Sequence, residues 1–296
     1  MSGPTSWQIS GGGYRAVVLE AGGGLGDVWH EDVRIVQGPD PAHVVSGGRG
    51  QVLAPWPNRL RDGRYAYAGE SHQLALSEPE RHNAIHGFAR WHAWRLRDRT
   101  DAKIRLGCRL PARKGYPWTL DLTIGYTASD EGLTVTLGAT NIDDTPAPFA
   151  AAMHPYLDAG APADECVLTL QARTRQCVDE RLLPTTTEPV TKPGEPRRLD
   201  GVVLDDAFTD LSRDDARWTR VRLEGRHAVE LCADSSWPWL QVFTGDTLPP
   251  GVARTAVAIE PMTAPADAFN SGTDLLDLVP GAPWSGTFRI SLGDAS

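Results

Sequence analysis

The sequence predicts an all-β fold, a single domain of antiparallel sheets over residues 1–296. Two observations support it. Short segments with apolar residues at every second position recur along the chain, and no stretch shows the periodicity of a helix of about 12 residues or more. The 30 glycines and 23 prolines are spread along the chain, as turns between many strands require. No repeat of about 20 to 50 residues is present, so a propeller or solenoid is disfavoured.

The strand patterns follow one another from the first third of the chain to its end. Alternation is clearest at residues 102–110, 120–128 and 132–142, where Thr and Arg take many of the intervening positions. Similar segments lie at residues 166–174, 220–225, 227–233, 239–245, 255–261 and 287–292. This pattern is typical of antiparallel sheets with one face on a core. We expect residues 185–201 to form a long surface loop and residues 272–280 a short helical turn.

Charge and composition exclude several classes of protein. The formal charge of -9 disfavours nonspecific binding to nucleic acid or to an anionic membrane. No apolar run approaches the ~18 residues of a membrane span, and the start of the chain lacks the pattern of a secretory signal. Four widely separated cysteines indicate reduced thiols, not a disulfide or metal framework. These observations predict a cytoplasmic protein without a metal or other cofactor.

Several ionisable residues lie close in sequence to prolines or aromatic residues. Arg59 follows Asn58 and a stiff Pro-Trp-Pro segment, which suits a guanidinium fork for hydroxyls or a carboxylate, although composition alone favours a surface arginine in a basic segment. His86 lies near Phe88, Trp91 and Trp94, rings that either stack on a sugar or belong to the core.

Three further positions combine polar groups with strand ends. His154 follows an apolar run and precedes Pro155, where it could face a cleft or bond a neighbouring loop. Asp205 lies between an apolar stretch and Phe208, where an Asx turn is the simple alternative. Glu260 ends the strand pattern directly before a proline, so it is either a solvated strand end or a working base.

In order, these segments resemble the aldose 1-epimerase (galactose mutarotase) family. The resemblance rests on "NRLRDGRYAYAGESHQL", "NAIHGF", "MHPYLDAG", "VLDDAFTDL", "WLQVFTGD" and "AIEPMTAPADAFNSG". It implies one β-supersandwich domain that interconverts the anomers of a free aldose, as a monomer or homodimer, without a cofactor. It also implies that Glu260 is the general base and His154 the general acid. Residues that would hold the sugar are Asn58, Arg59, His86, Tyr156, Asp205 and Gln241.

The chemistry of mutarotation explains these residue types. A base removes the proton of the anomeric hydroxyl while an acid protonates the ring oxygen, and we expect the two groups on opposite sides of the sugar ring. Activity should rise with pH through the titration of Glu260 and fall through that of His154.

Two other functions fit the same residues. A glycoside hydrolase would use Asp205 and Glu260 as its carboxylate pair, and a noncatalytic sugar-binding module would use the same sandwich. Residues 51–100 hold eight arginines against five acids, which indicates either an anionic sugar or a solvated face with ion pairs.

Overall fold

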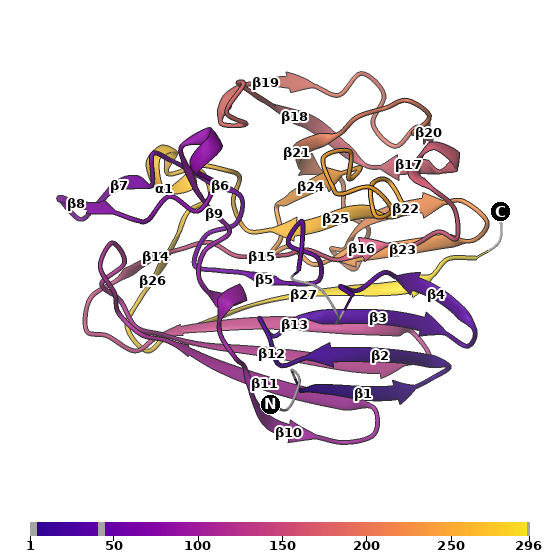
Figure 1. Ribbon diagram of the computed structural model, residues 1–296, viewed down its shortest axis with the longest axis horizontal. Coiled ribbons are helices and arrows are strands. Elements are labelled where there is room, and N and C mark those ends of the chain that lie inside the picture. The colour runs from indigo at the N-terminus through magenta and orange to yellow at the C-terminus, as the bar shows by residue number, and fades with distance from the viewer. Residues whose placement is uncertain (1–4, 41–44, 295–296) are drawn as a thin grey trace.

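The computed structural model describes residues 5–40 and 45–294, and it consists mainly of two large antiparallel sheets (Figure 1). The all-β prediction is therefore confirmed. The larger sheet contains, in spatial order, β1 (Ser6–Gly11), β2 (Tyr14–Leu19), β3 (Leu25–His30), β4 (Val33–Val36), β16 (Tyr156–Leu157), β25 (Val257–Met262), β24 (Trp239–Phe243), β21 (Asp205–Leu211), β18 (Ala172–Val178) and β19 (Pro184–Pro189). Two short strands join it beside β25, namely β15 (Ala152–Met153) and β5 (Val52–Leu53).

The second sheet holds the longest strands. It contains β10 (Arg95–Arg99), β11 (Lys103–Leu110), β12 (Leu120–Ser129), β13 (Gly132–Asn141), β27 (Pro283–Leu292), β23 (Ala228–Ala233), β22 (Thr219–Glu224), β17 (Val167–Leu170) and β20 (Arg197–Arg198). The three strongest sequence patterns correspond to β11, β12 and β13, which pair as consecutive antiparallel neighbours.

Smaller elements cluster at one end of the sandwich (Figure 1). They are the two-stranded pairs β6 (Arg59–Arg61) with β9 (Asn83–Ile85), β7 (Arg64–Tyr67) with β8 (Glu70–Gln73) and β14 (Ala147–Phe149) with β26 (Leu276–Leu278), and the helix α1 (Ala268–Ser271). Single 3-10 turns span Pro79–Arg81, Ala89–Trp91 and Ala163–Glu165.

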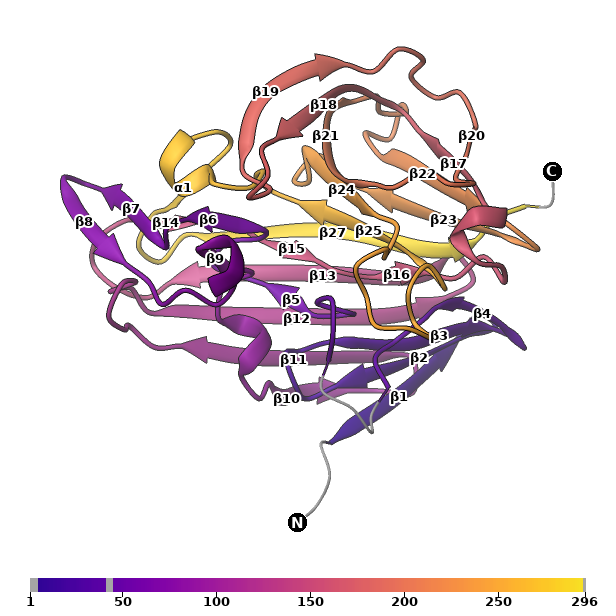
Figure 2. The same ribbon diagram turned by 45° about the horizontal axis from the view of Figure 1, so that its top comes forward.

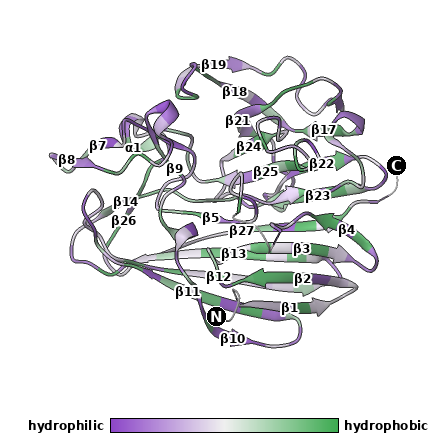
Figure 3. Ribbon diagram, viewed as in Figure 1, coloured by the Kyte–Doolittle hydropathy of each residue, from purple (hydrophilic) through white to green (hydrophobic). Residues whose placement is uncertain are grey.

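The core lies between the two large sheets, and Figure 2 shows β1 and β2 lying over β11–β13. Alternate side chains of both sheets join one cluster of buried residues, for example Val242 and Ile259 from the larger sheet and Leu231 and Phe288 from the second. In Figure 3, β2 is hydrophobic over much of its length, whereas the tip formed by β7 and β8 is largely hydrophilic. Among the described residues, no helix is long and apolar enough to cross a membrane.

Strand register decides which side chains face away from this core. Gln241 lies opposite Glu260, and both Tyr156 and Phe243 lie opposite Ala258. Asp205 lies opposite Phe243. Side chains that are paired across strands, or two residues apart on one strand, share a face. The side chains of Tyr156, Asp205, Gln241, Phe243 and Glu260 therefore lie on one face of the larger sheet, which we call its polar face.

Three local expectations were wrong. Glu260 does not end its strand, because β25 continues through Pro261 to Met262. The segment 185–201 is not one loop, since β19 reaches Pro189 and β20 occupies residues 197–198. Residues 272–280 contain β26 instead of a helical turn, and the short helix α1 ends just before them at Ser271.

Candidate active site

A cavity of about 350 Å³ opens on the polar face of the larger sheet. Six of the eight predicted site residues line it: Asn58, Arg59, His86, His154, Asp205 and Glu260. They come from segments far apart in sequence, brought together by β6, β9, β21, β25 and the break between β15 and β16. The other lining residues are Ser46, Gly47, Gly48, Ser77, Glu78, Glu80, Arg81, Ile85, Arg90, Phe243, Thr247, Leu248 and Pro249.

His154 and Glu260 are in direct contact at the floor of the cavity. The Nε2 atom of His154 lies 3.2 Å from Oε1 of Glu260, and the two side chains are 5% and 4% exposed. The expectation that they lie on opposite sides of a sugar was therefore wrong for the free protein. The anomeric and ring oxygens of an aldose are bonded to the same carbon, so two adjacent groups can still reach one oxygen each.

Pro261 explains why His154 lies at this point. The N–H groups of Ile259 and Thr263 donate to carbonyls of the neighbouring chain at 3.2 and 2.9 Å. Position 261, midway between them, has no N–H to donate. The pairing is broken there, between β15 and β16, and His154 occupies the break beside Glu260.

Burial acts in opposite directions on the two groups. It lowers the pKa of His154 to about 3, with the charges of Arg49 and Arg90 adding to the effect. Burial also raises the pKa of Glu260 well above its usual range, helped by the carboxylate of Asp205 and opposed by Arg59. Both directions favour an uncharged pair that holds a single exchangeable proton between Nε2 and Oε1.

His86 is oriented by Asn58. The backbone N–H of Asn58 donates to Nδ1 of His86 at 3.0 Å, and the backbone N–H of His86 donates to the Asn58 carbonyl at 2.9 Å. Both residues have positive φ, 52° and 63°, a conformation that Asn and His adopt more readily than most residues. With Nδ1 accepting, the neutral ring carries its proton on Nε2, and burial together with Arg90 lowers its pKa well below the usual value.

Arg59 is held by an acid that the sequence did not single out. Its Nε and Nη2 atoms donate to the carboxylate of Glu78 at 3.0–3.2 Å. Asn83 and Arg81 also donate to Glu78, at 3.2 and 3.1 Å. The Nη1 atom of Arg59 lies 3.7 Å from Asp205. The guanidinium plane is thus fixed by Glu78, and its Nη1 edge is directed towards Asp205.

Two predicted site residues do not line the cavity. Gln241 is buried and donates from Nε2 to Asp205 at 2.6 Å, so it fixes the Asp205 carboxylate from behind. Tyr156 is fully buried, and its hydroxyl donates to the carbonyl of Gly47 at 2.8 Å. Its ring lies parallel to that of His154, with centroids 5.1 Å apart.

The chain has relatives among known proteins. The family model described as aldose 1-epimerase matches residues 5–291. The chain belongs to the aldose 1-epimerase family. The protein YihR of Escherichia coli K12, described as uncharacterized, is 32% identical over 288 residues, which cover 95% of this chain and 91% of YihR.

Solved structures of the aldose epimerase fold agree with the sandwich. An aldose epimerase homologue from C. elegans superimposes with a TM-score of 0.85 at 18% identity, covering 98% of this chain and 100% of its own. A galactose 1-epimerase from Lactobacillus acidophilus gives a TM-score of 0.80 at 21% identity, covering 96% and 92%. At these identities the likeness shows the fold alone.

The aromatic residues close to His86 in the sequence, which could have stacked on a sugar, do not line the cavity. Trp94 is fully buried, and Phe88 packs edge-on against Trp56. Trp91 is 62% exposed and stacks under the guanidinium of Arg90. The ring that does line the cavity is Phe243, whose position opposite Ala258 on the polar face follows only from strand register.

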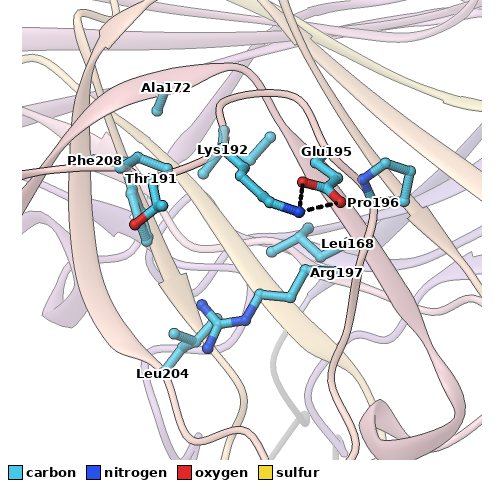
Figure 4. Close-up of a pocket in the computed structure, with 11 residues that line it drawn as sticks. Leu168, Ala172, Thr191, Lys192, Glu195, Pro196, Arg197, Leu204 and Phe208 are labelled. Atoms are coloured by element: carbon cyan, nitrogen blue, oxygen red, sulfur yellow. Dashed lines mark hydrogen bonds and ion pairs between the residues drawn. The ribbon is translucent and has the colours of Figure 1, made fainter.

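A second hollow of about 370 Å³ lies between the ends of the two large sheets (Figure 4). Its floor is apolar and includes Leu168, Leu204 and Phe208, and near its edge Lys192 pairs with Glu195 at 2.7 Å. It contains no carboxylate–imidazole contact, so it lacks the acid–base pair that distinguishes the first cavity. Across residues 5–40 and 45–294, no group of three His, Cys, Asp or Glu is arranged to hold a metal ion.

Proposed function

We propose that this family member is an aldose 1-epimerase that interconverts the α and β anomers of a free hexose. The observation that carries the proposal is the contact between His154 and Glu260 at the floor of the 350 Å³ cavity. A buried carboxylate and imidazole that together hold one proton suit a reaction whose net event is the transfer of a proton between two oxygens.

In ring opening, Glu260 takes the proton of the anomeric hydroxyl and His154 gives a proton to the ring oxygen. The bond between C1 and the ring oxygen breaks as the C1 carbonyl forms. The aldehyde then rotates about the C1–C2 bond, and the reverse transfers close the ring on its other face. This first step requires an ionised Glu260 and a protonated His154. That ion pair has the same number of protons as the uncharged pair, and it forms when one proton moves from Oε1 to Nε2, which are 3.2 Å apart.

The remaining cavity residues hold the sugar in this account. His86 presents Nε2–H as a donor, Asp205 presents an acceptor fixed by Gln241, and Arg59 presents the Nη1 edge left over by Glu78. Groups held this rigidly reduce the entropy lost in reaching the transition state.

The two rival functions explain the site less well. A glycoside hydrolase needs a pair of carboxylates with separate roles, yet the partner of Glu260 is an imidazole. A binding module without catalysis has no need for a buried acid–base pair, whose desolvation is costly.

Mutarotation of freshly dissolved α-glucose and α-galactose, followed by polarimetry, tests the proposal. We expect the protein to accelerate the approach to equilibrium beyond the buffer rate. A protein that binds these sugars without accelerating the drift, and that accelerates no anionic hexose either, would contradict it.

Arg90 specifically favours a second candidate, an anionic hexose as substrate. Arg90 lines the cavity, its only hydrogen bond among the described residues is from Nη2 to the Ile85 carbonyl at 3.3 Å, and its Nε is buried without a partner. Burial lowers its pKa to about 10, so it stays charged. Within the described part of the chain, no carboxylate lies within ion-pair distance of it.

Most of the arginines in residues 51–100 do not line the cavity. Arg95, Arg97 and Arg99 lie on the exposed strand β10 and do not line the cavity. Arg90 is therefore the residue to test. With neutral, phosphorylated and sulfonated hexoses compared, Arg90→Gln should raise KM for an anionic substrate about tenfold or more and leave a neutral one unchanged. Equal effects on both kinds of sugar would exclude an anion at Arg90, and Arg95→Gln is the matched control.

A further inference from the structure

Behind the catalytic histidine, three planar side chains form a stack. The guanidinium carbon of Arg49 lies 3.8 Å from the centroid of the Tyr156 ring. On the other side, the Tyr156 and His154 rings are parallel within 6° and 5.1 Å apart. Arg49 is 5% exposed and Tyr156 is fully buried, and of the three side chains only that of His154 lines the 350 Å³ cavity. Arg49 borders a separate hollow on the other side of the stack.

The charge of Arg49 has little local compensation. Its Nη1 atom donates to Oε1 of Gln37 at 2.7 Å and to the Gln37 carbonyl at 3.4 Å, while Nη2 is buried without a partner. Within residues 5–40 and 45–294, no carboxylate lies within ion-pair distance of it, and Asp27 and Asp158 act on it only over a longer range. A buried cation without a counterion destabilises a fold, so its presence beside an active site suggests a role there.

The glycine-rich segment around Arg49 forms a close cradle for the stack. A Cβ added to Gly48 would come within 2.6 Å of the His154 ring, and one added to Gly47 within 2.7 Å of the Tyr156 hydroxyl. The carbonyl of His154 accepts from the N–H of Gly50 at 2.8 Å, and its N–H donates to Gln51 at 3.1 Å. This segment therefore holds both the backbone and the ring of His154.

We propose that Arg49 is a positioning residue for the reaction, which acts through Tyr156 to fix the plane of the His154 ring and to oppose a second proton on the His154–Glu260 pair. The proposal rests on the proposed function of that pair. Tyr156 serves as a spacer between Arg49 and His154, because its hydroxyl group already donates a hydrogen bond to the carbonyl of Gly47.

All the groups that face His154 enter this account. Glu260 contacts Nε2, the His86 ring lies edge-on with centroids 5.8 Å apart, Arg90 lines the same cavity, and Arg49 lies behind Tyr156. After burial itself, the charge of Arg49 is the largest cause of the lowered pKa of His154, ahead of Arg90.

The pH profile of kcat in Arg49 variants tests the proposal. Arg49→Met removes the charge but keeps much of the volume, and we expect the acid limb to move to higher pH by about one unit, from a unit charge acting over roughly 9 Å inside a protein. Arg49→Lys keeps the charge without the planar stack. It should keep the acid limb in place while kcat falls a few-fold. Arg15→Met removes a comparable contact, between Arg15 on β2 and the Trp29 ring on β3, and is the control that should change neither.

A titration of the His154 ring by NMR, in the full-length protein, separates this proposal from the proposed function. Its signal is assigned by its loss in His154→Asn, and Arg49→Gln is the second variant should Arg49→Met fail to fold. A raised pKa of His154 in Arg49→Gln supports the proposal even if no tested sugar is a substrate. An unchanged pKa of His154 and an unchanged acid limb in folded variants would overturn it.

Discussion

The Nε2 atom of His154 lies 3.2 Å from Oε1 of Glu260, and each side chain is almost fully buried. Two ionisable groups this close titrate as one unit, so limbs of a pH profile belong to the pair. The productive unit holds one proton: with two it cannot accept the hydroxyl proton, and with none it cannot protonate the ring oxygen.

The profile of activity against pH should therefore be a broad bell. The acid limb is the loss of the second proton, and the pKa of His154, lowered to about 3, places it far below the usual histidine range. The alkaline limb is the loss of the remaining proton, and the raised pKa of Glu260 moves it upward. This order reverses the sequence prediction, which assigned the rising limb to Glu260 and the falling limb to His154, because burial shifts the two pKa values in opposite directions. We expect a plateau between about pH 5 and 8, wider than the interval between the free values of about 4.3 and 6.5. A narrow optimum inside that interval would contradict the shared-proton account.

Replacing the acid should change the shape of this profile. In His154→Asn, Glu260 must be ionised to act alone, and burial keeps its pKa raised. Residual activity should then rise with pH through a single limb without falling again, about 10²–10⁴-fold below the wild type. His82→Asn is the matched control, because His82 is exposed and pairs with Asp62 outside the cavity. If His154→Asn keeps both limbs, the acid is another group, and His86 is the first to test.

The ion pair of Arg59 and Glu78 should matter for both binding and stability. Arg59→Lys keeps the charge but cannot form the two parallel hydrogen bonds that Nε and Nη2 of Arg59 donate to Glu78, so kcat/KM should fall about tenfold. Glu78→Ala leaves a largely buried guanidinium with only the longer ion-pair contact to Asp205 and should lower the free energy of unfolding by about 3 kcal/mol in urea denaturation. Unchanged kinetics in Arg59→Lys would remove Arg59 from the site.

The stability that Glu78 contributes depends on pH in a defined direction. Burial alone would raise its pKa, but the hydrogen bonds and charge of Arg59 lower that pKa below its usual value. A carboxyl group whose pKa is depressed in the folded state stabilises the protein at pH values above its unfolded-state pKa of about 4.3. That stabilisation is lost as the pH falls through the folded-state pKa. Wild type and Glu78→Gln should thus converge in stability below about pH 4. A constant difference between them would contradict the pairing.

Adjacent aspartates offer a sharp comparison of function and stability. Asp205 faces the cavity and is fixed by Gln241, whereas Asp206 faces the opposite side of β21 and pairs with Arg175. Asp205→Asn should raise KM for the sugar about tenfold at little cost in stability. Asp206→Asn should lower the melting temperature and leave KM unchanged. A raised KM in Asp206→Asn with an unchanged KM in Asp205→Asn would contradict the strand register of β21.

The fold and much of the site could be predicted because their signals are local. Period-two alternation found β11, β12 and β13 within a residue or two of their ends. Short motifs found six residues that the fold does bring to one cavity. What could not be predicted depends on contacts across long sequence separations. Glu78 matters only because β6 and β9 place it beside Arg59.

The continuation of β25 past Pro261 shows the same limit. A proline usually ends a strand pattern, but here the neighbouring chain is broken at the position that would need its N–H. The role of segment 46–51 had no signal beyond its glycines, which have positive φ at positions 47, 48 and 50. Only the packed structure shows that they enclose His154.

The most direct test of the central claim is the rate of ring opening in Glu260→Gln, measured by exchange NMR between anomers at equilibrium. The amide keeps the shape of the side chain but cannot accept the hydroxyl proton, so kcat should fall at least about 100-fold while sugar affinity and the melting temperature stay close to wild type. Glu230→Gln, on the second sheet beside Arg220, is the matched control and should keep full activity. Retention of more than about a tenth of kcat in folded Glu260→Gln would show that this carboxylate is not the base.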